Sequence, residues 1–140
     1  MTDIQFIVPG IPAPQPRPRV FRQGPYGSRT VSAMPGDPVH AFKATCRLMA
    51  SQAYQGPLLD EPVALTLLFV FPRLQNNRSQ GRVLYPGKKD IDNVAKATMD
   101  ALNGVIWRDD VLVCKLIASK LQAAVGEQPH TEVVIWKARD

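Results

Sequence analysis

Asp90 and Asp92 stand two residues apart where a polar loop is expected to enter a helix, directly behind Lys88 and Lys89. Hard cations such as Mg²⁺ take oxygen ligands, usually one or two carboxylates together with phosphate oxygens of a substrate. The pair therefore indicates metal-dependent chemistry on a phosphate backbone. For Asp92 a simpler interpretation stays open, because an aspartate can also serve as the N-cap of a helix.

A second acidic pair, Asp109 and Asp110, follows about one helix length later and opens the next apolar run. In a compact layered domain, the end of one strand can return beside the start of the preceding helix. We therefore expect Asp110 to join Asp90 and Asp92 in a nest of three carboxylates. The alternative is ordinary turn chemistry, because aspartates are common in the turns that precede strands.

Lys96 lies four residues beyond Asp92, so the two share one face of the expected helix. One interpretation is an ion pair one turn apart, which stabilises a helix by only about 0.2–0.5 kcal/mol. The other places the ammonium over the scissile phosphate, where it would counter charge that develops in the transition state. Spacing alone favours the ion pair.

Positive charge is concentrated in two segments of the chain. The formal net charge is +5 at pH 7, and neither residues 11–30 nor residues 72–89 contain an acidic residue. Such segments favour a polyanionic partner whose backbone they bind without reading its sequence. The alternative is a globular protein that is merely basic. The candidate residues for binding such a partner are Arg17, Arg19, Arg73, Arg78, Lys88 and Lys89.

The length and hydropathy pattern predict a single mixed α/β (α+β) domain spanning residues 1–140. We expect a mixed sheet of about four strands packed with two main helices. Alternating prolines in residues 11–19 predict an extended arm, and the polar, basic residues 73–88 predict a long loop. The expected strands cover residues 4–8, 63–71, 111–120 and 131–137, and the expected helices cover residues 40–53 and 92–103.

Cys46 and Cys114 lack the spacing of a metal site and lie in apolar patterns. We expect both to be reduced core residues, which fits a cytoplasmic protein. No stretch approaches the roughly 18 apolar residues of a membrane span, and the N-terminal residues lack the basic and apolar regions of a secretion signal. We therefore expect no membrane partner.

The run from Lys88 to Asp110 resembles the RusA family of Holliday junction resolvases, small endonucleases of bacteria and their phages. The shared pattern is a basic residue, Asp-x-Asp-Asn, a lysine one turn on, Asp-Ala-Leu, a hydrophobic-Trp element and Asp-Asp. The arm Gln15-Pro16-Arg17-Pro18-Arg19 also looks like the start of many members. The chain departs from the pattern at Leu112, where many members carry Gln, and this casts doubt on any polar role there.

The resemblance implies a homodimer that cuts four-way DNA junctions with Mg²⁺ in DNA recombination and repair, in the cytoplasm of a bacterium or from a prophage. By the same resemblance, Asp90, Asp92 and Asp110 are the metal-binding catalytic acids, and Lys96 is the essential lysine. Asp109 is the neighbouring acid that is not a principal ligand. Two rival functions stay open: a non-catalytic basic DNA-binding module, and a small metal-dependent phosphohydrolase that acts on nucleotides.

Overall fold

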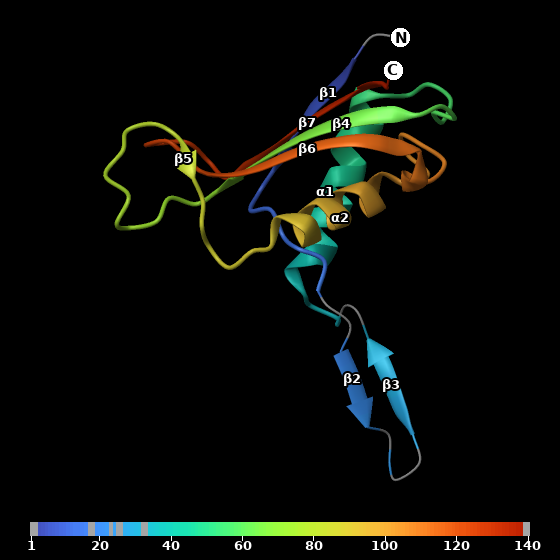
Figure 1. Cartoon of the computed structure of the whole chain (residues 1–140), viewed down its shortest axis with the longest axis horizontal. Coiled ribbons are helices and arrows are strands. Elements are labelled where there is room, and N and C mark those ends of the chain that lie inside the picture. The colour runs from blue at the N-terminus through green and yellow to red at the C-terminus, as the bar shows by residue number, and fades with distance from the viewer. Residues whose placement is uncertain (1–2, 17–18, 23, 25–26, 32–33, 139–140) are drawn as a thin grey trace.

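The computed structural model describes residues 3–16, 19–22, 24, 27–31 and 34–138 of the 140-residue chain. Helices and strands are mixed along the chain, as the hydropathy pattern predicts (Figure 1). In chain order the elements are β1 (Ile4–Pro9), β2 (Arg19–Arg22), β3 (Ser28–Val31), α1 (Pro38–Ala53), β4 (Val63–Phe71), β5 (Val83–Leu84), α2 (Ile91–Leu102), the 3-10 turn η1 (Asp110–Leu112), β6 (Val113–Gln122) and β7 (His130–Lys137).

Five strands form one mixed sheet in the order β1-β7-β4-β6-β5, and β2 pairs with β3 in a separate hairpin. β4 and β6 are parallel, and the other neighbours in the five-stranded sheet are antiparallel. The expected mixed α+β class is confirmed, with one strand more than expected in the main sheet. The additional strand, β5, has only two residues, which are too few to show a strand periodicity in the sequence.

Both helices cover the same face of the sheet, which is the lower face in Figure 1. Leu65, Leu67 and Phe69 of β4 are fully buried and belong to one core with Phe42 of α1 and Ala97 of α2. β4 lies between β7 and β6 and is buried almost throughout, which explains its nearly continuous apolar sequence. The core therefore lies between the helices and the middle of the sheet.

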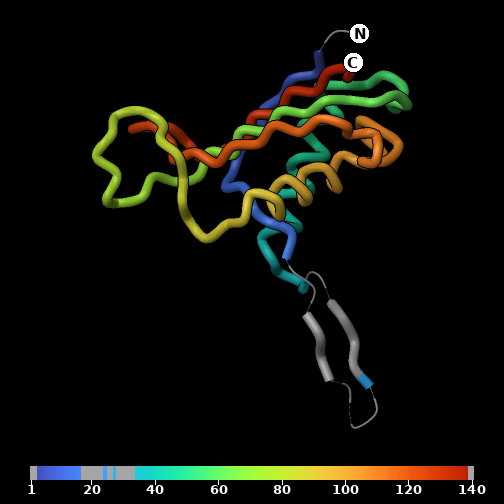
Figure 2. The backbone as a smooth tube through the Cα atoms, viewed as in Figure 1, coloured from blue at the N-terminus to red at the C-terminus, as the bar shows by residue number. Residues whose placement is uncertain are grey.

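α2 is the helical part of the crossover between the parallel strands β4 and β6. A parallel pair cannot be joined by a tight hairpin, so the chain has to cross over the sheet before it adds the second strand. α2 accordingly begins after the long loop that follows β4 and ends beside the start of β6 (Figure 2). The far end of β6, at Lys120, returns to the loop that leads into α2.

Polar contacts fix α2 against its neighbours. The Lys43 ammonium of α1 donates to Asp100 Oδ2 at 2.7 Å. Arg47, also in α1, donates through Nη1 to the carbonyl oxygens of Ala101 and Asn103, at 2.9 and 3.0 Å. The proline-rich segment contributes as well, because the Gln15 N–H donates to the Asn93 carbonyl at 2.9 Å. The helix that carries the acidic motif is thus held from two sides.

The two cysteines lie in different environments. Cys46 is fully buried in α1, and burial raises the pKa of its thiol to about 12. Cys114 is exposed, so the expectation of a core residue is wrong for it. The cause is an irregularity in the pairing with β4, where Val63 faces Val113 but Ala64 faces Lys115, which leaves Cys114 without a partner residue. Within the described part of the chain, no helix is long and apolar enough to cross a membrane.

Candidate active site at the two ends of α2

Asp90 and Asp92 lie together at the N-terminal end of α2, and both are exposed. Asp90 occupies the N-cap position with an extended backbone, yet its side chain makes no capping hydrogen bond. Asn93 Nδ2 lies 3.4 Å from its Oδ2. Asp92 lies inside the first turn, so the interpretation of Asp92 as the N-cap is wrong. The positive end of the helix dipole favours negative charge at this place.

The loop before these acids is held by Lys120 of β6, a residue that sequence reasoning missed. Its Nζ donates to the Gly87 carbonyl at 3.1 Å and to the Lys89 carbonyl at 2.5 Å. The same ammonium lies 5.3 Å from the centre of the Tyr85 ring, and that ring stacks on Phe71 at 4.5 Å. A signal was present, because a lysine stands at a strand position whose alternation places it on the helix-covered face.

Lys96 is exposed one turn along α2 from Asp92. No hydrogen bond or ion pair joins Lys96 to any other residue of the described part of the chain. The expected ion pair with Asp92 is therefore not formed. The ammonium remains available to a ligand, one helical turn beyond Asp92.

At the C-terminal end of α2, a polar network holds Asp110. Asn103, which caps this end, donates from Nδ2 to Asp110 Oδ2 at 3.3 Å, and its Oδ1 accepts from the Trp107 indole N–H at 2.8 Å. Trp107 is fully buried. Asp109 has a different task, because its Oδ1 accepts from the Val111 N–H at 3.2 Å and caps η1. The two members of the Asp-Asp pair are thus not equivalent.

The expected nest of three carboxylates does not form within one chain. α2 has 12 residues, so its ends lie about 18 Å apart, with Asp90 and Asp92 at one end and Asp110 at the other. Among the described residues, no group of three or more His, Cys, Asp or Glu side chains could hold a metal ion together. The reason is topological: the strand end that returns to the start of α2 carries Lys120, whereas Asp110 precedes the strand.

The carboxylates at the start of α2 nevertheless suit a hard cation in kind. Mg²⁺ is commonly held by one or two carboxylates and completes its shell with water and substrate phosphate oxygens. Asp90 and Asp92 offer such a pair on an exposed helix end. Asp110 is half-buried, and one of its oxygens already accepts a hydrogen bond from Asn103. A Mg²⁺ site with few protein ligands therefore fits Asp90 and Asp92 better than it fits Asp110.

The candidate DNA-binding residues fall into three groups. Arg78, Lys88 and Lys89 are exposed in the long loop. Arg73 is half-buried, and its guanidinium donates to the carbonyls of Ala123, Asn77 and Ser79, so it holds the loop in shape. Arg17 lies outside the described residues, and of Arg19 only the backbone in β2 is described. Contact with DNA stays a prediction for all of them.

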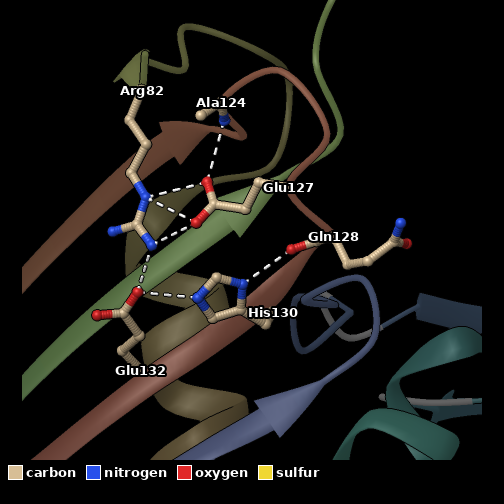
Figure 3. Close-up of polar contacts among 6 residues, drawn as sticks. All are labelled: Arg82, Ala124, Glu127, Gln128, His130 and Glu132. Atoms are coloured by element: carbon tan, nitrogen blue, oxygen red, sulfur yellow. Dashed lines mark hydrogen bonds and ion pairs between the residues drawn. The ribbon is translucent and has the colours of Figure 1, made fainter.

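A charged cluster joins the end of the long loop to the turn between β6 and β7 (Figure 3). Arg82 Nη2 lies 2.6 Å from both Glu127 Oε2 and Glu132 Oε2. The bond from Arg82 lowers the pKa of Glu127 to about 2. Burial opposes ionisation of Glu132, but hydrogen bonds from His130 and Arg82 outweigh it and lower the pKa of that carboxyl. The cluster holds the long loop just before β5, and so helps to position the segment that follows β5 and leads to Asp90.

Comparison with known proteins places the chain in a family. The family model described as Endodeoxyribonuclease RusA matches residues 9–136, a span that includes the acids at both ends of α2, Lys96 and Lys120. An uncharacterized protein, YqaN of Bacillus subtilis (strain 168), is 32% identical over 147 aligned positions, which cover 96% of this chain and 96% of that protein. The match over nearly the whole chain confirms the resemblance seen between Lys88 and Asp110. The protein belongs to the RusA family of endodeoxyribonucleases.

Proposed function

We propose that the protein is a Mg²⁺-dependent endonuclease that resolves four-way DNA junctions by paired nicks during recombination and repair. The observation that carries this proposal is the exposed Asp90–Asp92 pair at the start of α2, with Lys88, Lys89 and Lys96 around it. The two carboxylates suit a cation that binds both protein and phosphate, and the surrounding lysines suit the phosphate itself. The family supplies the reaction class, endonucleolytic cleavage of DNA.

In this proposal, Asp90 and Asp92 are the residues that would hold Mg²⁺. When bound, the ion neutralises phosphate charge and lowers the pKa of a bound water molecule. Lys96 is exposed one turn beyond Asp92 and attracts the scissile phosphate. Lys88 and Lys89, next to Asp90 in the chain, orient the backbone without reading its sequence. All of these side chains are exposed, so the DNA can reach them without a rearrangement of the core.

Asp110 enters the proposal as a third required acid, by family resemblance. One chain holds it a helix length away from Asp90 and Asp92, so the proposal does not give it a direct contact to the same ion within that chain. Asn103 donates one hydrogen bond to its carboxylate, at 3.3 Å, and this contact supports a function that depends on geometry. Replacement of Asp110 by Asn should therefore reduce cleavage, whereas replacement of Asp109 should be milder because Asp109 caps η1.

We propose a homodimer as the active form. A four-way junction has approximate two-fold symmetry, and two identical sites related by a two-fold axis would face equivalent strands. This arrangement explains how one small chain can make paired nicks. The substrate implies a location where bacterial DNA is accessible, the cytoplasm, whether the gene is chromosomal or carried by a prophage.

The decisive experiment compares cleavage of a synthetic junction, a linear duplex and a single strand of the same sequence, with and without Mg²⁺. The wild-type protein should nick only the junction efficiently, and only with Mg²⁺. Asp92→Asn should bind the junction but not cut it, and the matched control Asp60→Asn, an exposed acid elsewhere on the surface, should cut normally. Binding by the wild type without cleavage under any divalent cation would support the non-catalytic module, and hydrolysis of free nucleotides would support the phosphohydrolase.

A further inference from the structure

Lys120 occupies an unusual position for a lysine. It lies in β6 opposite Phe69 of β4, and the alternation of the strand places it on the helix-covered face with Leu116 and Ala118. Lysine is rarely retained on a core-facing position unless its ammonium finds partners, because a desolvated charge is costly. The contacts of the Lys120 ammonium therefore indicate the role of this residue.

Those partners all belong to the segment that leads into Asp90. The ammonium donates to the carbonyls of Gly87 and Lys89 and lies over the ring of Tyr85. The backbone of Lys120 takes part too, because its carbonyl accepts from the Tyr85 N–H at 3.0 Å. One residue thus binds the segment at its start, its middle and its last position before the helix.

The contact to Lys89 has direct consequences for the acids. Lys89 is joined by one peptide bond to Asp90, and Asp92 follows in the first helical turn. Hydrogen bonds from an ammonium to a carbonyl are roughly twice as strong as neutral ones. Both residues lie in the long loop between β4 and α2, where Gly87 is half-buried and Lys89 is exposed. When the Lys89 carbonyl is held in place, the backbone positions that carry the Asp90 and Asp92 side chains are held as well.

We propose that Lys120 is a positioning residue that sets the geometry of the Asp90–Asp92 pair through the Gly87 and Lys89 carbonyls. The proposal rests on the proposed function, in which these two acids hold the metal ion. Lys120 does not touch the ion or the DNA in this arrangement. Its ammonium donates to the loop carbonyls, and the cation–π contact with the Tyr85 ring helps to hold the ammonium in this orientation.

The test uses three variants of the full-length protein. Lys120→Met keeps the length of the side chain and its packing on Tyr85 but removes the donors. Lys120→Arg restores a cation with several N–H donors and should recover part of the effect. Lys115→Met is the matched control, because it removes a lysine from the same strand on the opposite face of the sheet. Melting curves identify any variant that fails to fold.

The first measurement is hydrogen exchange, which does not depend on activity. The Tyr85 N–H is bonded to Lys120 O and the Val94 N–H to Asp90 O, so these two amides lie at the two sides of the segment. Lys120→Met should accelerate exchange in peptides that cover residues 85–94, while Lys115→Met should leave them unchanged. Unchanged exchange in Lys120→Met would overturn the proposal, even if activity fell.

The second measurement separates metal binding from DNA binding. Outer partners of a metal site typically cost 10–100-fold in metal affinity or activity when lost, so Lys120→Met should weaken Mn²⁺ binding and lower kcat by roughly that factor. Its KM for the junction and the salt dependence of binding should match those of Lys115→Met. A larger loss of junction affinity, with a reduced salt slope, would show instead that Lys120 contacts phosphate, and would overturn the positioning role.

These readouts also distinguish the two levels of the proposal. If the wild-type protein binds no Mn²⁺ and cuts no DNA, the proposed function is wrong, and hydrogen exchange alone still decides whether Lys120 positions the loop. If the wild type binds metal and cuts while Lys120→Met does both equally well, the proposed function stands and the role of Lys120 is refuted.

Discussion

The two ends of α2 both carry aspartates, but the protein holds them by different means. At the N-terminal end, Asp90 and Asp92 are exposed and follow a loop that one lysine, Lys120, binds through backbone carbonyls. At the C-terminal end, Asp110 is half-buried and tied to the core through Asn103 and Trp107. The first end depends on a loop held through backbone carbonyls, whereas the second is bound to a buried side chain of the core.

The chemistry of the groups fixes the network at the C-terminal end. An indole N–H can only donate, so the amide of Asn103 must turn its oxygen toward Trp107. The amide nitrogen is then left to donate to the Asp110 carboxylate, as observed. Arg47 supports the same corner by binding the Ala101 and Asn103 carbonyls, which end the helix. Here side chains, rather than a loop, determine the orientation of the acid.

The largest effect is expected from the acids at the open end. Asp90→Asn and Asp92→Asn should each reduce junction cleavage to background, because each removes a charged ligand of the proposed metal site. Junction binding should persist or increase, since repulsion toward phosphate is lost. The melting temperature in chelator should fall only slightly, because the helix dipole stabilises an exposed carboxylate at this place by about 0.3–1 kcal/mol. Cleavage assays and melting curves check this. A variant that melts well below wild type would mean that these acids hold the fold.

Lys96 should come next, because it lies at the same open end without a described partner. Lys96→Ala should slow cleavage by about 100-fold, the typical cost of losing one group that stabilises transition-state charge. The melting temperature should hardly change, since no contact is lost within the described residues. Single-turnover rates beside thermal unfolding provide the measurement, with Lys96→Arg as the control. A steep fall in stability with normal activity of the folded fraction would make the lysine structural.

The same substitution at both ends of α2 sharpens the comparison. Asn103→Leu leaves the buried indole N–H of Trp107 without an acceptor and should lower the free energy of unfolding by about 1–3 kcal/mol. Asn93→Leu removes only a long contact to Asp90, 3.4 Å, and should stay within about 0.5 kcal/mol of wild type. Urea unfolding of both variants is the measurement. Equal losses would show that the two ends are held alike.

The smallest expected effect is on the stability of the protein at low pH. Glu127 has a lower pKa folded, about 2, than its ordinary value of 4.5, so its bond to Arg82 contributes stability above about pH 4.5 that is lost as pH falls toward 2. Glu127→Gln should therefore destabilise by roughly 1 kcal/mol at pH 7, with a difference from wild type that shrinks between pH 4.5 and 2. Melting at a series of pH values tests this, and a constant difference would contradict it.

Much of the fold was predictable because its signals are local. The apolar run of β4 is expected at residues 63–71, where the structure places it. The helix α2 is expected from a cap at residue 92 or 93 to about residue 103, whereas its cap is Asp90 and it ends at Leu102. β6 begins two residues later than expected, because Asp109 caps η1 and delays the strand. What the sequence could not reveal is non-local: which end of β6 meets which end of α2, and therefore that Asp110 lies far from Asp90 while Lys120 lies near it.

The parallel pairing of β4 with β6 has a consequence for how the protein is made. Val63 pairs with Val113, so the chain must close a loop of about 50 residues before that pair can form, and such distant pairing makes folding slow. The ribosome adds Asp90 and Asp92 to the chain before it adds Lys120. Until β6 pairs with β4, the acids lie on a loop that Lys120 does not yet hold. We therefore expect competence for DNA cleavage to arise only after β6 has paired.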